Sequence, residues 1–148
     1  MFQPMGQTTD NLIKTLSQIG NVSEQDFAEI LSMGEGPSVR IFYSALKSLG
    51  ANVVYIDPAQ DNWPIITDSN FHDAKPNVEK TKTLVNKYLE PMLGKNILVV
   101  CGFFGRDEQG NITTLGRGGS DMTALLIAHC LEADEVILVK DVDGIPLS

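Results

Sequence analysis

The stretch Ile97-Leu98-Val99-Val100-Cys101, which runs directly into Gly102, decides the fold. An unbroken apolar run bounded by glycine is typical of a strand that is covered on both faces of a sheet. Two further runs share this pattern, at residues 53–56 and 136–139, and both are rich in β-branched side chains. We therefore predict three strands, each of which runs into polar or glycine residues at its end.

Apolar residues at helical spacing lie before and between the predicted strands and indicate five helices. The first helix follows the cap-type residues Thr8, Thr9 and Asp10 and ends at Gly20. A second, short helix is capped by Ser23, and a third begins near residues 34–37. The fourth is expected over residues 78–93, and the fifth begins around residues 120–121, with Ser120 or Asp121 as its cap.

Strands that alternate with helices favour an α/β fold, here a three-layer α/β/α sandwich around a mainly parallel sheet. Residues 58–76 are rich in Asp, Asn and Pro and are predicted to form a loop with at most one short strand. The chain shows no internal repeat and no linker, and its 148 residues fit one domain. Open α/β sheets bind ligands beyond the carboxyl ends of their strands, so residues 101–103 and 140–144 are expected at one functional edge.

Composition and charge exclude several classes of partner. Hydrophobic residues make up 43% of the chain and the net charge is −8, the wrong sign for binding nucleic acid or an anionic membrane surface. The sequence contains no apolar run of about 18 residues and no secretory signal at its start, which predicts a cytoplasmic protein. Cys101 and Cys130 are far apart and have no neighbours at zinc spacing, so both are expected to be buried thiols.

The glycine-rich segment at residues 113–121 carries the strongest local signal. Gly116, Gly118 and Gly119 permit backbone conformations that other residues avoid, and they let amide groups approach a ligand. Arg117 adds a forked positive donor that suits a carboxylate or phosphate. The segment therefore predicts an anion cradle, although its spacing matches neither a dinucleotide fingerprint nor a P-loop. The alternative is a glycine-rich turn that only begins a helix.

Three other segments allow both a functional and a structural interpretation. Glu35 fits the first turn of a helix on dipole grounds alone. Residues 140–145 resemble an ordinary exit from a strand, but their place at its carboxyl end favours a function. Residues 6–10 suit a helix cap, and their threonine hydroxyls and amides also suit a bound carboxylate.

Taken in order, these segments resemble the aspartate kinases of the amino-acid kinase superfamily. The match runs through the segments Pro4-Met5-Gly6-Gln7-Thr8-Thr9-Asp10-Asn11-Leu12, Ser32-Met33-Gly34-Glu35, Thr67-Asp68, Ala74-Lys75-Pro76, Gly102-Phe103, Thr114-Leu115-Gly116-Arg117-Gly118-Gly119-Ser120-Asp121 and Lys140-Asp141-Val142-Asp143-Gly144-Ile145. The Leu-Gly-Arg-Gly-Gly-Ser-Asp stretch is the specific one, because it separates aspartate kinases from relatives that act on other acceptors. The resemblance covers essentially the whole chain.

The resemblance implies a set of site residues. Those around the amino-acid substrate would be Gln7, Thr8, Thr9, Asp10, Asn11, Glu35, Arg117, Gly118, Gly119 and Ser120. Arg117 would clamp a carboxylate, Glu35 would help fix the substrate through its ammonium group, and Asp121 would organise cationic groups at the phosphoryl-transfer centre. Those at the nucleotide would be Lys140, Asp141, Asp143, Gly144 and Ile145, and Lys140 stands where the family has a threonine.

The resemblance further implies transfer of the γ-phosphoryl group of ATP, with Mg²⁺, to the side-chain carboxylate of L-aspartate. Residues 1–148 would be part of an amino-acid kinase catalytic domain without its first Lys-Phe-Gly-Gly strand, the rest of its nucleotide-binding half and the ACT domains. We expect such a fragment to be weak or inactive, and its exposed sheet edges favour a homo-oligomer. The alternatives are a non-catalytic amino-acid-binding or assembly module and a related kinase with another carboxylate acceptor.

Overall fold

A pair of parallel strands forms the centre of the computed structural model, which describes residues 6–116 and 118–139 and, for residues 6–10, the backbone alone. Strand β1 (Val53–Ile56) pairs with β2 (Ile97–Val100) in the register Val53 to Ile97. The ladder continues beyond β2, where the Cys101 N–H donates to the Ile56 carbonyl at 2.9 Å. Two of the three predicted strands are therefore confirmed.

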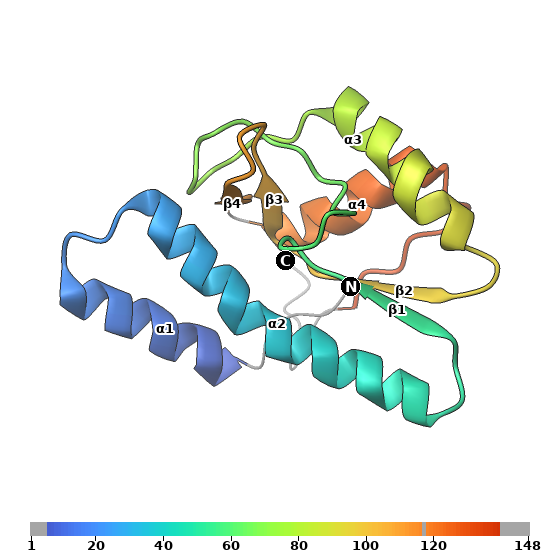
Figure 1. Cartoon of the computed structure of the whole chain (residues 1–148), viewed down its shortest axis with the longest axis horizontal. Coiled ribbons are helices and arrows are strands. Elements are labelled where there is room, and N and C mark those ends of the chain that lie inside the picture. Colours follow the sequence, from blue (N-terminus) through green and yellow to red (C-terminus); the bar gives the residue numbers. More distant parts are fainter. Residues whose placement is uncertain (1–5, 117, 140–148) are drawn as a thin grey trace, which may run out of the picture.

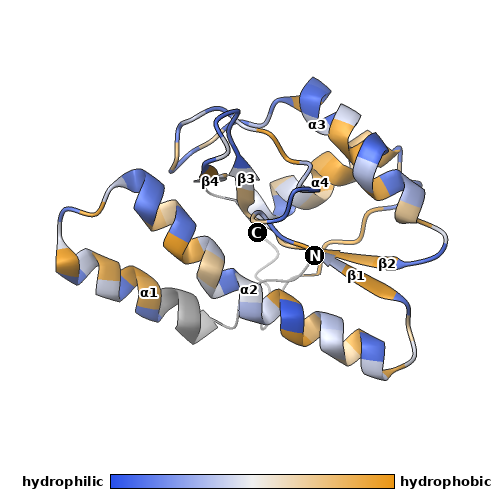
Figure 2. Cartoon of the chain, viewed as in Figure 1, coloured by the Kyte–Doolittle hydropathy of each residue, from blue (hydrophilic) through white to orange (hydrophobic). Residues whose placement is uncertain are grey.

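Helices cover both faces of this sheet, and Figure 1 shows the strands between two helical layers. One layer holds α1 (Gly6–Ile19) and α2 (Glu24–Ser48), and the other holds α3 (Val78–Leu84) and α4 (Gly119–Leu131). The buried core between the layers contains side chains of α2, both strands and α4, among them Val39, Ile56, Val99 and Leu126, and Leu12 of α1 packs against it. Both strands carry hydrophobic colours in Figure 2. The predicted α/β class is confirmed.

Helix α2 is one continuous element, so the prediction of two separate helices over this part of the chain is wrong. The predicted cap is present, because the Asp26 N–H donates to the Ser23 hydroxyl oxygen at 3.1 Å. The helix then continues through Gly34, Gly36 and Pro37. These residues disfavour a helix interior by about 1 kcal/mol for glycine and 3 kcal/mol for proline. Burial of the face that includes Ala28, Leu31 and Val39 offsets that cost.

The predicted helix over residues 78–93 is present, but it changes type along its length. After α3 it continues as the π-helical turn η1 (Val85–Leu89) and ends as the 3₁₀ turn η2 (Glu90–Met92). The Glu90 N–H donates to the Val85 carbonyl, five residues back, and Pro91 has no N–H to donate. This change in hydrogen bonding explains why the element is not a single α-helix. Gly94 follows with a left-handed φ of 88°.

A β-hairpin that the sequence analysis did not predict follows β2 directly. Strands β3 (Phe104–Arg106) and β4 (Ile112–Thr114) pair antiparallel. Their turn is built around Asp107, whose carboxylate accepts the N–H groups of Gln109 and Asn111. Burial raises the pKa of Asp107, but hydrogen bonds from Asn111, Ser69 and Gln109 outweigh burial and leave the pKa below its ordinary value.

The third predicted strand, at residues 136–139, does not form. The segment has no regular secondary structure and is exposed, with 74% of Ile137 and 89% of Val139 accessible to solvent. Among the described residues no backbone pairs with it, and an apolar run becomes a strand only where a partner completes its hydrogen bonds. The loop at residues 58–76 likewise forms only isolated bridges, at Ile66 and Thr67. No helix in the described ranges is long and apolar enough to cross a membrane.

Candidate active site

The exit of β2 and the beginning of α4 meet at Phe103. Its N–H donates to the Thr123 hydroxyl oxygen at 3.1 Å, and its carbonyl accepts the Leu115 N–H at 2.8 Å. Leu115 immediately precedes the glycine-rich turn. The turn therefore lies at the carboxyl end of a parallel strand, where α/β sheets place their ligands.

The glycine-rich turn has the conformations that its composition predicts. Gly116 and Gly118 have left-handed φ values of 77° and 70°, and the Gly119 N–H donates to the Gly116 carbonyl at 3.1 Å. Gly116 also lies against the preceding loop, because a Cβ there would be 2.6 Å from an Asp73 carboxylate oxygen. Arg117 lies outside the described residues.

The first turn of α4 differs from the prediction. The helix begins at Gly119 with Gly118 in the capping position, so Ser120 and Asp121 lie inside the helix and neither is its cap. Because glycine has no Cβ, Gly118 can adopt a left-handed conformation in the capping position. The helix therefore begins one residue before Ser120. Both side chains are partly buried. Among the glycine amides, that of Gly119 is used within the turn itself.

Glu35 is the unusual group of the described structure. It lies on the inner face of α2, only 6% of it is exposed, and its Oε2 is the one buried side-chain oxygen or nitrogen without a hydrogen-bond partner among the described residues. Burial raises the pKa of Glu35 to about 8. Isolated buried carboxylates are costly, so such a group points to a missing cationic partner.

Glu35 lies close to the exit of β2. Burial raises the pKa of the Cys101 thiol, and the negative charges of Glu35 and Asp57 raise it further. Cys101 directly precedes Gly102 and Phe103, the residues that lead to the glycine-rich turn. Both cysteines are buried thiols, as predicted.

The amino-terminal motif lies against the same part of α2. Gln7, Thr8, Thr9 and Asp10 lie in the first turns of α1, which begins at Gly6, so the prediction that residues 8–10 cap this helix is wrong. Asn11 is exposed. The next residue, Leu12, lies very close to Gly34. A Cβ added at Gly34 would be 2.2 Å from Leu12 Cδ1. Gly34 directly precedes Glu35, so α1 packs on the same turn of α2 that carries Glu35.

The remaining predicted site residues are not placed. Lys140, Asp141, Asp143, Gly144 and Ile145 lie outside the described residues, as does the expected meeting of residues 140–144 with residues 101–103. In residues 6–116 and 118–139, no three His, Cys, Asp or Glu side chains are grouped to hold a metal ion. Among the described residues, the structure thus places Glu35 near Cys101 at the end of β2, next to the contact of α1 with α2, and it places the glycine-rich turn at the exit of the same strand.

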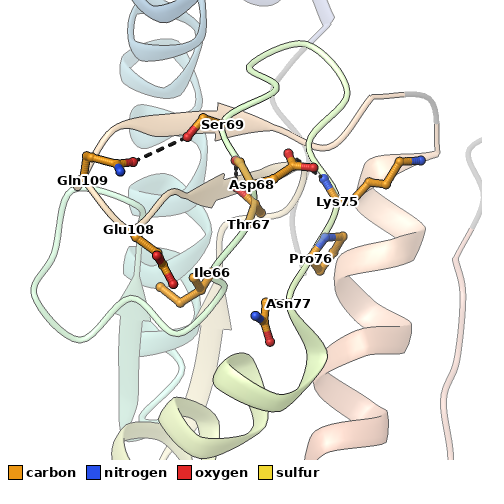
Figure 3. A pocket seen from close by; sticks show the side chains of 9 residues that line it. All are labelled: Ile66, Thr67, Asp68, Ser69, Lys75, Pro76, Asn77, Glu108 and Gln109. Carbon is orange, nitrogen blue, oxygen red and sulfur yellow. Dashed lines mark hydrogen bonds between the residues drawn. The ribbon is translucent and has the colours of Figure 1, made fainter.

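A second, polar pocket of about 460 Å³ lies between the loop at residues 66–77 and the tip of the hairpin (Figure 3). Its lining includes Asp68 and Ser69. Asp68 Oδ1 accepts the N–H groups of Asn70 and Lys75, and the Ser69 hydroxyl donates to Asp107. These groups satisfy one another, so the pocket gives less indication of a ligand than Glu35 does.

Comparisons with known proteins show the family of the chain. The sequence profile of the amino acid kinase family matches residues 5–147, and the chain therefore belongs to this family. Within it the chain is similar to aspartokinases, as its motifs suggested. It is 37% identical over 143 residues to that of Bacillus sp. (strain MGA3) and 34% identical over 142 residues to that of Geobacillus stearothermophilus.

Each of these two alignments covers 95% of this chain and 33% of the relative, so the chain spans about a third of the length of the relatives it matches. Among solved structures, aspartokinase III of E. coli in complex with aspartate and ADP superposes with a TM-score of 0.73 and 28% identity. That match covers 88% of this chain and 30% of the E. coli chain.

Proposed function

We propose that residues 1–148 belong to the catalytic domain of an aspartate kinase and form much of its amino-acid site. The protein as a whole would transfer the γ-phosphoryl group of MgATP to the side-chain carboxylate of L-aspartate, giving 4-phospho-L-aspartate. The family membership and the aspartokinase relatives support this reaction class. Because the chain spans about a third of those relatives, we propose aspartate binding for the chain itself and phosphoryl transfer for the whole protein.

The observation that carries the proposal is the buried, unpartnered carboxyl of Glu35. A substrate ammonium group would supply the cationic hydrogen-bond donor that this carboxyl lacks. Arg117 would clamp a substrate carboxylate with its forked guanidinium. Gln7, Thr8, Thr9, Asp10 and Asn11 would border the same ligand together with Gly118, Gly119 and Ser120. A zwitterionic amino acid with a second carboxylate fits these charges.

The chemistry needs no general base, because the side-chain carboxylate of aspartate is already ionised near neutral pH. One of its oxygens bonds to the γ-phosphorus while the bond to the leaving ADP oxygen breaks. Two anions must meet in line, so the reaction depends on positive charge and amide donors. Arg117 and Lys140 would supply the charge, Asp121 would orient these cationic groups, and Asp141, Asp143, Gly144 and Ile145 would adjoin the nucleotide. Mg²⁺ would enter with ATP.

Calorimetric titration of the 148-residue chain with L-aspartate tests the proposal. Glu35→Gln removes the charge that would hold the ammonium group, and we expect at least a tenfold weaker dissociation constant. Glu29→Gln makes the same chemical change on the exposed side of α2 and should bind aspartate as the wild type does. N-acetyl-aspartate, which has no ammonium group, should bind weakly to all three. Equal aspartate affinity in the two variants would remove Glu35 from the site.

The acceptor is tested with the whole protein and MgATP. ADP release should be fastest with aspartate and much slower with glutamate or N-acetylglutamate. Aspartate binding without ADP release in the whole protein would instead identify a non-catalytic amino-acid-binding module. A preference for another carboxylate acceptor would identify a related kinase.

A further inference from the structure

A single buried hydroxyl joins the exit of β2 to the beginning of α4. Thr123 lies in the second turn of α4 and is completely buried. Its hydroxyl donates to the Gly119 carbonyl at 2.8 Å and accepts the Phe103 N–H at 3.1 Å. The same oxygen therefore contacts Phe103 and Gly119, which are separated by the fifteen residues of the hairpin and the turn.

The residue that Thr123 holds has a strained backbone. Phe103 adopts a left-handed φ of 83°, a conformation that is strained for a residue with a bulky side chain. Such a conformation persists only where several contacts fix it. Here both backbone groups of Phe103 are hydrogen-bonded, the N–H to Thr123 and the carbonyl to the Leu115 N–H.

The side chain of Phe103 lies against Gly119, at the end of the glycine-rich turn. A Cβ at Gly119 would lie 2.9 Å from Phe103 Cδ2 and 3.0 Å from the Cβ of Leu115, so only glycine fits against the ring. A shift of Phe103 would therefore move either the ring or the first turn of α4. Because Leu115 also bonds to Phe103, both ends of residues 115–119 depend on it.

We propose that Thr123 is a positioning residue, whose hydroxyl fixes the left-handed Phe103 and through it the shape of the glycine-rich turn that binds aspartate. That aspartate is the ligand rests on the proposed function. The link from Thr123 through Phe103 to the turn rests on the hydrogen bonds described above. Thr123 itself does not touch the substrate. Its effect is on the geometry of the turn before the ligand arrives.

Three variants separate positioning from general stability. Thr123→Val keeps the shape and removes the hydroxyl, while Thr123→Ser keeps the hydroxyl. Thr81→Val is the matched control, because Thr81 is also completely buried and its hydroxyl accepts a backbone N–H, that of Ile66 at 3.2 Å, in a different helix. If Thr123→Val does not fold, Thr123→Ala removes the same hydroxyl with a smaller side chain.

Three properties of these chains are measured: the melting temperature, the aspartate dissociation constant and the rate of amide hydrogen exchange. We expect Thr123→Val and Thr81→Val to lower the melting temperature similarly, but only the former to raise the aspartate dissociation constant, by about tenfold. Amide hydrogen exchange should quicken by about tenfold at Phe103, Leu115 and Gly119 in Thr123→Val alone. Thr123→Ser should restore the wild-type aspartate dissociation constant and the wild-type exchange rates. Unchanged exchange at those amides, or an exchange increase equal to that of Thr81→Val, would overturn the inference.

The two proposals fail in different ways. A wild-type chain that does not bind aspartate would contradict the proposed function, and the exchange experiment would still decide the role of Thr123 in the turn. Aspartate binding that Thr123→Val and Thr81→Val weaken equally would leave the function intact and overturn the positioning role.

Discussion

Glu35 carries the proposed function. Because its carboxyl is buried, we expect the stability of the chain to depend on pH in a specific way. Its pKa is about 8 in the folded chain and 4.5 is the ordinary value. Between these values the folded chain keeps a proton that the unfolded chain has lost. The contribution of Glu35 to the free energy of unfolding should therefore be highest below pH 4.5 and fall as pH rises to 8, by an amount on the order of 4 kcal/mol.

Urea unfolding of the wild type and Glu35→Gln at pH 5 and pH 8 measures this effect. Glutamine cannot ionise, so the variant should lose less stability than the wild type over the same interval. Subtracting the two curves removes the contribution of every other titrating group. Parallel pH dependence in the two chains would show that Glu35 is ionised, or solvated, in the folded state.

At the scale of elements, the packing of α1 on α2 depends on Gly34. The sequence pattern predicted a helix boundary near this glycine, but it lies inside α2. A Cβ at Gly34 would be 2.2 Å from Leu12 Cδ1, whereas a Cβ at Gly36 would meet no atom within 4 Å. The two glycines are two positions apart in one helix. They therefore form a matched pair for alanine substitution.

We expect Gly36→Ala to stabilise the chain by no more than about 0.5 kcal/mol, because alanine favours a helix but its Cβ lies next to the ring of Pro37, and no atom outside the neighbouring residues is within 4 Å. Gly34→Ala gains the same propensity but must displace Leu12, so it should be about 1 kcal/mol less stable than Gly36→Ala. Denaturant unfolding of both variants at one pH gives the difference. If both alanines stabilise equally, α1 does not pack on α2 at this point.

The elements also show what the sequence could predict and what it could not. The strands at Val53–Ile56 and Ile97–Val100 were predictable because continuous apolar runs have few alternatives in a small domain. The continuity of α2 was not, since the burial that offsets Gly34, Gly36 and Pro37 depends on distant elements. The hairpin was not predicted because its strands have only three residues each, although its turn has the Asp107 and Gly110 of a common β-turn, in which the Gly110 N–H donates to the Asp107 carbonyl.

The candidate site was predictable to a different degree. The left-handed glycines of the turn follow from composition, and Glu35 follows from the family motif. Nothing local in the sequence shows that Glu35 is buried without a partner, or that Thr123 reaches back to Phe103. Both features arise from contacts between segments far apart in the chain. The predicted roles of Arg117 and residues 140–145 stay predictions.

For the whole molecule, the exposed apolar segment at residues 136–139 predicts self-association. Strand β2 pairs on one side only, with β1, among the described strands, and exposed apolar segments beside open sheet edges promote pairing between chains. Ile137 and Val139 are the most exposed members of the segment. The 148-residue chain should therefore show an apparent mass by light scattering that rises with concentration.

The double variant Ile137→Lys, Val139→Lys should reduce this association by adding charge to the exposed segment. Ile19→Lys, Leu49→Lys is a matched control, since these two residues are also exposed and apolar but lie at helix ends. A monomeric wild-type chain at all concentrations would contradict the prediction. So would equal effects of the two double variants.

The central claim is that Glu35 receives the ammonium group of an amino acid, and the proton balance of binding tests it most directly. With a pKa of about 8, Glu35 is about nine-tenths protonated at pH 7, and a bound ammonium group would force it to ionise. Calorimetry of aspartate binding at pH 7, in two buffers of different ionisation enthalpy, should show release of up to about 0.9 proton per aspartate in the wild type and almost none in Glu35→Gln. A binding enthalpy that gives the same proton count for both chains would contradict the claim.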